Sequence, residues 1–226
     1  MPVVPGSVRA AGKSRVSWAM ESDFDLLERW RAGDRNAGTR LFERHFKPLY
    51  RFFRNKVGDD AEDLVQQTFL ACVQSLDGFR GDASFRTYLF TVARNKIHHH
   101  FSRHQRKQGL IDFGVTSVID LGVSVQRLMV RDEEHNHLLH ALRKLPVDLQ
   151  IALELHYFEG LTGPELAGVL EVPEGTVRSR LRRGRDLLRE ALAELTASSE
   201  RAETTMTSIE SWAEEIRDKV LGPKSS

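Results

Sequence analysis

Arginine side chains recur along one short stretch of this 226-residue chain, where together they would attract phosphate. A short apolar helix is expected from Thr162, and a break at Glu171-Val172-Pro173 separates it from a second helix. From Arg178 to Arg189 that second helix holds one acid, Asp186, against Arg178, Arg180, Arg182, Arg183, Arg185 and Arg189. Two helices around a tight break predict a helix-turn-helix, whose second helix enters the DNA major groove. Its positive field suits the DNA backbone.

Start signals and side-chain spacing support both helices. Thr162 followed three residues later by Glu165 predicts a capping box. Pro164 and Pro173 suit the first turns of the two helices, where a backbone N–H is not needed. Within the second helix, Val177, Leu181 and Leu188 predict a buried stripe, while Arg178, Arg182 and Arg185 face outward. The alternative is a solvated basic helix, but solvated faces usually mix charges of both signs.

A second constellation lies at 79–107, where aromatic and basic residues alternate. The aromatic residues are Phe85, Tyr88, Phe90 and Phe101, and no acid occurs from Arg94 to Lys107. Basic groups follow a phosphate backbone and aromatic faces stack on unpaired bases, so this segment favours single-stranded or melted nucleic acid. The alternative is that the apolar residues are core, and we adopt it for Leu89 and Ala93.

A helix expected over 62–76 has an apolar face and a polar face. Its apolar residues are Leu64, Val65, Phe69, Cys72, Val73 and Leu76. Asp63, Gln66 and Gln67 point elsewhere and leave a polar surface that a partner could contact. The pattern alone favours an ordinary solvated face.

The histidines at His98, His99, His100 and His104 raise the question of a metal site. His100 and His104 would share a helical face, but no acid or thiol lies nearby and structural zinc usually takes four ligands. We therefore expect no metal and no cofactor. No nucleophile–base spacing, phosphate-binding glycine loop or pair of acids indicates an enzyme.

Composition sets the outer limits. The net charge of +1 means that affinity for nucleic acid must come from local patches. No apolar run approaches the ~18 residues of a membrane span, and no signal sequence is evident. The single cysteine, Cys72, excludes an internal disulfide. These features predict a soluble cytoplasmic protein.

Composition also divides the chain. We expect a flexible N-terminal tail, a first helical domain, a linker, a second helical domain and a C-terminal extension, at 1–21, 22–104, 105–131, 132–196 and 197–226. In the extension, Ile209, Trp212, Ile216 and Val220 suggest a short amphipathic helix. With no alternating strand pattern of any length, the predicted fold is all-α, with two small helical domains joined by a linker.

Three ordered segments resemble a bacterial RNA polymerase sigma factor of the extracytoplasmic-function (ECF) subfamily. They are EDLVQQTFL at 62–70, FRGDASFRTYLFTVARNKI at 79–97, and LPVDLQIALELHYFEGLTGPELAGVLEVPEGTVRSRLRRGRDLLRE at 145–190. The resemblance spans roughly residues 22–194. It implies that the first domain is region 2, which binds core polymerase and opens the promoter −10 element. The second domain is then region 4, which reads the −35 element.

The resemblance also assigns roles to residues. Contacts with core polymerase fall on Asp63, Gln66 and Gln67. Contacts with the −10 strand fall on Ser84, Phe85, Tyr88, Arg94, Asn95, His98 and Arg103. Contacts with −35 DNA fall on Arg178, Ser179, Arg180, Arg182 and Arg183. The implied partners are core RNA polymerase (its β′ clamp and β flap), promoter DNA and an anti-sigma factor, with the protein at the nucleoid when bound to polymerase.

Two other hypotheses stay open at this point. One is a helix-turn-helix regulator that binds duplex DNA without polymerase, although such a protein has no use for the aromatic and basic segment at 85–107. The other is a metal-dependent enzyme or sensor built on the histidine run.

Overall fold

The computed structural model of the chain describes residues 21–75, 83–104, 111–122, 133–196 and 198–209, together with 211 and 213. The tail before Glu21, the linker parts 105–110 and 123–132, and Trp212, Ile216 and Val220 lie outside these ranges. In the described ranges the regular structure is helical, apart from one isolated bridge between Ser117 and Pro146. The all-α prediction is confirmed.

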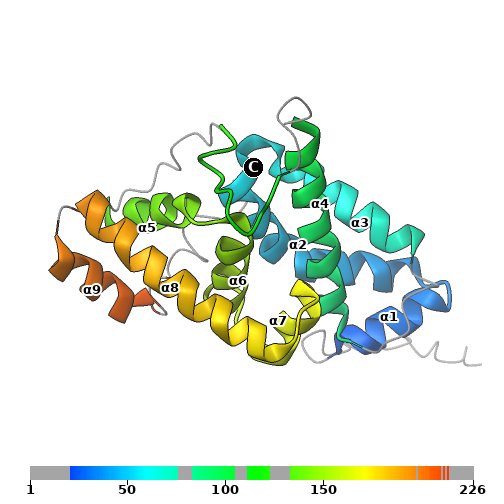
Figure 1. Cartoon of the computed structure of the whole chain (residues 1–226). Coiled ribbons are helices and arrows are strands. Elements are labelled where there is room, and N and C mark those ends of the chain that lie inside the picture. Colours follow the sequence, from blue (N-terminus) through cyan, green and yellow to red (C-terminus); the bar gives the residue numbers. More distant parts are fainter. Residues whose placement is uncertain are drawn as a thin grey trace, which may run out of the picture.

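The first helical group is the N-terminal domain (Figure 1). It contains α1 (Asp23–Arg31), α2 (Arg35–Val57), the 3-10 turn η1 (Gly58–Asp60), α3 (Ala61–Gln74) and α4 (Phe85–His104). Ser22 and Asp34 cap α1 and α2 by accepting backbone N–H bonds. The helices bury Phe52, Phe53 and Phe90, whose rings pack edge to face. This core holds α3 and α4 side by side.

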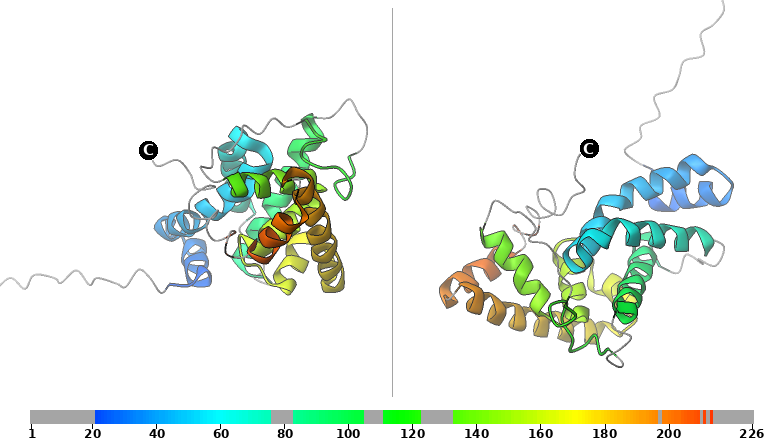
Figure 2. Two further views of the ribbon diagram at one scale, coloured as in Figure 1. Left: turned by 90° about the vertical axis from the view of Figure 1, so that its left-hand side faces the viewer. Right: turned by 90° about the horizontal axis from the view of Figure 1, so that it is seen from above.

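The second helical group is the C-terminal domain. It contains α5 (Glu133–Lys144), α6 (Val147–Tyr157), α7 (Gly163–Leu170) and α8 (Glu174–Thr196), and α9 (Ser199–Thr207) lies along α8 (Figures 1 and 2). Leucines of α5, α6 and α8 form its core, which Ala202, Met206 and Ile209 complete from the C-terminal extension. Gly184 lets α8 approach α6 closely, because a Cβ there would lie 3.1 Å from Leu153.

The helix-turn-helix predicted from the sequence is confirmed as α7 and α8. Glu165 accepts hydrogen bonds from the Thr162 backbone N–H and hydroxyl, each at 2.8 Å, which is the expected capping box. Val177 and Leu188 are fully buried and Leu181 is half-buried, as the stripe predicted. The turn passes through Glu171 in the left-handed conformation, with φ of 54°.

The two domains pack directly against each other. Helix α4 lies against α7, and α2 touches α5 and α6 (Figure 1). The boundary between the domains is therefore formed by α2 and α4 on one side and by α5, α6 and α7 on the other. One apolar cluster continues from α2 and α4 into Ile151, Leu155 and Val169 of the C-terminal domain. The approach of α4 to α7 is close, because a Cβ on Gly168 would lie 2.9 Å from the Thr87 methyl group.

Buried ion pairs cross the same boundary. Arg51 of α2 bonds both carboxylate oxygens of Glu159 at 3.1 Å. Lys56, which is fully buried, pairs with Glu154 of α6. Asn55 donates to the same Glu154 at 2.9 Å. Burial lowers the pKa of Lys56 below its usual value, although the negative charges of Glu154 and Glu159 act to raise it. The buried cations of α2 therefore depend on the acids on and just after α6 for their ion pairs.

Residues 111–122, within the expected linker, cover the start of α6. The carbonyls of Thr116 and Phe113 accept the backbone N–H bonds of Val147 and Asp148, at 2.9 and 3.1 Å. These N–H groups belong to the first turn of a helix, which has no partners for them within the helix itself. Val118 is buried in the shared core, so this piece of chain packs as part of the fold.

Candidate nucleic-acid interface

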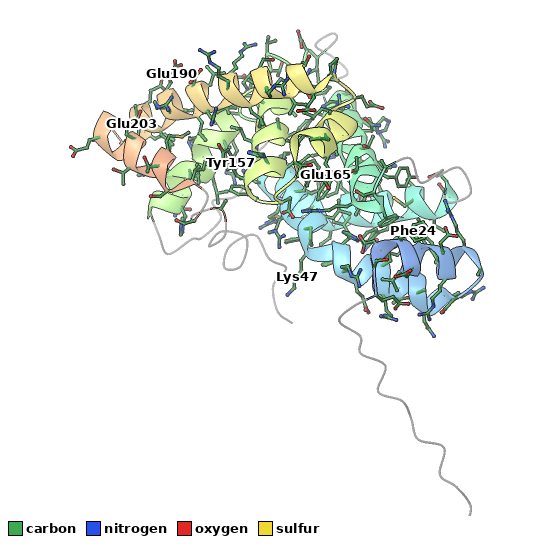
Figure 3. The ribbon with its side chains drawn as sticks, turned by 90° about the horizontal axis from the view of Figure 1, so that it is seen from below. Phe24, Lys47, Tyr157, Glu165, Glu190 and Glu203 are labelled. Carbon is green, nitrogen blue, oxygen red and sulfur yellow. The ribbon has the colours of Figure 1, made fainter. Side chains whose placement is uncertain are left out.

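The outer face of α8 presents a row of arginines to solvent. Arg178, Arg182, Arg183 and Arg185 are exposed, as is Ser179. The side chains along this edge of α8 project away from the rest of the molecule (Figure 3). Arg178 is 73 % exposed and pairs with Glu174 at 3.1 Å on the same helix, an arrangement that is weak in water. This face can therefore exchange its internal contacts for DNA at little cost.

Arg180 has different surroundings from the other arginines. Its side chain is 27 % exposed, and its Nη1 lies 3.8 Å from Asp148 Oδ2. The row predicted from the sequence therefore divides into four residues on the open face and Arg180 at the domain boundary.

Helix α4 places its predicted −10 residues in three environments. Ser84, Asn95 and Arg103 are exposed. Tyr88 is half-buried, and its hydroxyl is hydrogen-bonded to Ser75 Oγ at the end of α3. Phe85 is 4 % exposed and packs with its ring 5.5 Å from that of His45. In this structure Phe85 belongs to the core, because the first turn of α4 faces α2, and it offers no open face to a base.

Arg94 and His98, also predicted for the −10 strand, are paired with the C-terminal domain. Arg94 Nη1 bonds Glu171 Oε2 at 3.2 Å, and His98 Nε2 bonds Asp148 Oδ1 at 3.0 Å. The His98 ring stacks on Phe113, with centroids 4.2 Å apart. Both side chains point to the domain boundary.

Asp148 is the common neighbour of these cations. Its burial acts to raise the pKa of the carboxyl, but the His98 hydrogen bond and the charges of His98, Arg94 and Arg180 outweigh it, and the pKa is lowered. Asp148 is therefore ionised at neutral pH, as a partner for positive charge must be.

The predicted polymerase-contacting residues lie on one open side of α3. Asp63 and Gln66 are exposed, and Gln67 donates to Asp63 Oδ2 at 2.6 Å. A hollow between α3 and α4 brings two of them together with basic residues of α4. It is lined by Asp60, Asp63, Leu64, Gln67, Lys96, His99, His100 and Arg103.

The histidine run does not gather ligands in the described part of the chain. His98 pairs with Asp148, His99 is exposed, and His100 lies 3.7 Å from Asp60. Nowhere in the described ranges do three His, Cys, Asp or Glu side chains come together as they would around a metal ion.

Sequence reasoning did not find the acids of the C-terminal domain that contact α2 and α4: Asp148, Glu154, Glu159 and Glu171. Each lies about 50 to 110 residues along the sequence from its partner, and hydrophobic periodicity carries no information about contacts over such separations. Glu171 alone gave a local signal in the sequence. It stands at the end of a helix, where the left-handed conformation normally takes Gly or Asn, so a glutamate there indicates a contact made by its side chain.

These features define a class: a two-domain helical protein with a helix-turn-helix and a second basic helix rich in aromatic residues. Sigma-70 region 2 is matched over residues 41–107 and Sigma-70 region 4 over residues 135–188. RNA polymerase sigma-H factor of Pseudomonas aeruginosa is 33 % identical over 186 residues, which cover 77 % of this chain and 96 % of that protein. The chain belongs to the sigma-70 family, in its ECF group.

Other relatives agree. The ECF RNA polymerase sigma-E factor of Escherichia coli is 29 % identical over 176 residues, covering 74 % of this chain and 92 % of that one. Among solved structures, CnrH in complex with the cytosolic domain of CnrY gives a TM-score of 0.57 at 26 % identity, covering 76 % of this chain and 97 % of that one. The sigma factor RpoE bound to the anti-sigma factor NepR, from Bartonella quintana, gives 0.50 at 25 % identity, covering 65 % and 91 %. No described helix is long and apolar enough to cross a membrane.

Proposed function

We propose that this sigma factor binds core RNA polymerase and directs it to promoters whose −35 element is read by α8 and whose −10 element is opened and held by α4. The observation that carries the proposal is the exposed arginine row on the second helix of a helix-turn-helix. Arginine pairs bidentately with guanine edges in the major groove, which is worth ~1–3 kcal/mol of discrimination per pair.

The −10 role rests on α4. Tyr88 is half-buried, and Asn95 and Arg103 are exposed on the same helix. Flipping a base costs a few kcal/mol, and stacking on an aromatic face returns ~1–3 kcal/mol. The protein recognises the promoter and opens its strands, and the polymerase catalyses RNA synthesis, so we assign no enzymatic activity to the chain itself.

Three partners complete the proposal. The β′ clamp of core polymerase would bind the α3 surface formed by Asp63, Gln66 and Gln67. The β flap would bind the C-terminal domain. Both structural relatives above are complexes, one of them with an anti-sigma factor by name, which supports an anti-sigma partner here as well. The protein would act in the cytoplasm, at the nucleoid when bound to polymerase.

The test is transcription in a purified system. The protein and core polymerase, mixed with fragmented genomic DNA of the source organism, should initiate at a small set of sites that neither starts alone. Mapping those starts gives both promoter elements.

Tyr88→Ala should reduce open-complex formation on these promoters about tenfold and leave duplex binding nearly unchanged, with Tyr88→Phe as the milder control. A chain that binds DNA but never co-elutes with core polymerase would instead be a polymerase-independent regulator.

A further inference from the structure

We propose that a hollow between α8 and the C-terminal extension binds a nucleotide, and that the bound nucleotide competes with −35 DNA for Arg182. This α8–α9 hollow has a volume of about 580 Å³, within the ~300–1,000 Å³ of small-molecule sites. Its walls come from the end of α6, from α8, from α9 and from Ile209 just beyond α9. The nucleotide site needs only this geometry, whereas the competition rests on the proposed function.

Three arginines of α8 supply the positive charge of the hollow. Arg182, Arg185 and Arg189 follow one another at spacings of three and four residues, which places them on one side of the helix. The side chains of Arg182 and Arg185 are exposed and make no hydrogen bond or ion pair within the described ranges. A phosphate group binds such guanidinium groups bidentately, so the hollow presents two unoccupied phosphate-binding side chains.

Two carboxylates in the same hollow favour a ligand that carries more than phosphate. Arg189 donates to Asp186 Oδ1 at 3.4 Å, and its Nε lies 2.6 Å from Glu203 Oε1 without the alignment of a hydrogen bond. Both acids are more than half exposed and keep acceptor positions that Arg189 does not use. Carboxylates accept hydrogen bonds from the hydroxyl groups of ribose, as in dinucleotide sites. A bare phosphate would meet only their repulsion.

The remaining wall of the hollow is aromatic and apolar. Tyr157 at the end of α6 is half-buried, and Met206 and Ile209 are mostly buried. Figure 3 shows Tyr157 and Glu203 on the side of α8 along which α9 runs. An aromatic ring or a thioether can pack on the flat face of a base. Guanidinium groups for phosphate, carboxylates for ribose and an apolar wall for a base together match a nucleotide.

Arg182 connects this site to the proposed reading of DNA. It lines the α8–α9 hollow and is also one of the residues predicted to contact the −35 element. A guanidinium group that holds a nucleotide phosphate cannot pair with DNA at the same time. Coupling between two ligands is reciprocal, so the −35 duplex should weaken nucleotide binding as much as the nucleotide weakens duplex binding.

The first test is isothermal titration calorimetry of the full chain with ADP, GDP and UDP, and with pyrophosphate as the phosphate-only probe. We expect one molecule of at least one nucleotide to bind per chain, about tenfold more tightly than pyrophosphate, which is the scale of one stacked base. Arg185→Gln should weaken that binding about tenfold, the scale of a hydrogen bond to a charged group. Arg183→Gln is the matched control, because it removes the same charge from an exposed position of α8 outside the described lining.

A second pair of variants approaches the hollow from α9. Thr207 is exposed and lines the hollow, so Thr207→Glu places a repelling carboxylate beside the phosphate without disturbing the core. Thr204→Glu makes the same change at another exposed position of α9, outside the described lining. We expect Thr207→Glu to weaken nucleotide binding about tenfold more than Thr204→Glu does.

The competition is measured by fluorescence anisotropy on a promoter fragment mapped as above. A nucleotide at about ten times its Kd should weaken duplex binding by the native chain about tenfold, and by Arg185→Gln only about twofold.

The site is overturned if no nucleotide binds at up to about 1 mM, or if pyrophosphate binds as tightly as every nucleotide. Equal losses in Arg185→Gln and Arg183→Gln, or in Thr207→Glu and Thr204→Glu, overturn it as well. Nucleotide binding that leaves duplex binding unchanged refutes the competition for Arg182. A chain that binds nucleotide as expected but neither binds a promoter duplex nor starts transcription with core polymerase would retain the site and count against the proposed function only.

Discussion

Arg178 and Arg180 lie two positions apart on α8 and are held in different ways. Arg178 is 73 % exposed, and its pair with Glu174 is on the same open face. Arg180 is 27 % exposed and points to Asp148 at the domain boundary. If α8 reads DNA as proposed, Arg178 is available without rearrangement, whereas Arg180 must first separate from Asp148. Neighbouring residues of one motif thus differ in how readily they are available.

We expect Arg178→Ala to weaken binding of the −35 duplex by roughly five- to 150-fold, the range that follows from losing about 1–3 kcal/mol of base contact. Fluorescence anisotropy on a mapped promoter fragment would measure it. Lys47→Ala is the control, because Lys47 is also an exposed cation but lies far from α8 (Figure 3). Equal losses in the two variants would mean that Arg178 contributes only general charge.

A second residue-scale prediction concerns Cys72, which is fully buried in α3. Burial raises the pKa of its thiol to about 12. At about pH 8 such a thiol is ionised in only about one molecule in 10,000, and the thiolate is the reactive form. Ellman's reagent should therefore label the native protein very slowly and the urea-unfolded protein within seconds. Rapid labelling of the native protein would show that α3 opens locally.

At the scale of elements, α9 and the residues that follow it complete the core of the helix-turn-helix domain. Ala202 and Ala213 are fully buried, and Met206 and Ile209 nearly so. Arg189 of α8 pairs with Glu203 at 2.6 Å, which adds a polar contact at the edge. The sequence of α9 is rich in threonine, which forms helices poorly, so packing on α8 supplies most of its stability.

Removing residues 197–226 should lower the free energy of unfolding of the C-terminal domain by up to about 3–6 kcal/mol, from the burial of Met206 and Ile209 alone. Thermal unfolding followed by circular dichroism would measure the fall in Tm. A chain ending after Ala213 keeps these contacts and should melt like the full protein. An unchanged Tm in the chain that lacks residues 197–226 would contradict the role given to α9.

At the scale of the whole molecule, Lys56 and Glu154 tie the domains together from positions 98 residues apart. Lys56 is fully buried and also donates to the Phe52 carbonyl at 2.7 Å. The buried cations Arg51 and Lys56 of α2 thus meet their carboxylate partners only when the C-terminal domain is docked.

Lys56→Met should destabilise the folded chain by about 3–5 kcal/mol, because Glu154 is left buried without its cation. Urea unfolding would measure this. The double variant Lys56→Met/Glu154→Leu should recover most of the loss, since apolar pairs of similar volume replace buried ion pairs well. If the double variant is as unstable as the single one, packing rather than charge explains the effect.

The sequence could predict what is local. Helix periodicity and the Thr162 capping box depend on residues within a few turns, and the helices and the capping box are confirmed. Val73, which was predicted for the buried face of α3, is instead 46 % exposed. The burial of Phe85 could not be predicted, because the aromatic pattern suits both a core and a stacking platform. The closure of α4 on α7 was equally beyond reach, since it depends on single acids that pair across a whole domain.

The dependence of Lys56 on a distant glutamate also bears on synthesis. On the ribosome the N-terminal domain emerges first, and Arg51, Asn55 and Lys56 are translated well before Glu154 and Glu159. At about 5–20 residues per second, the nascent chain waits roughly 5–20 seconds with this cationic face uncovered. During that interval the half-made protein exposes both apolar surface and unpaired cations beside ribosomal RNA, a polyanion that would hold it until the glutamates arrive.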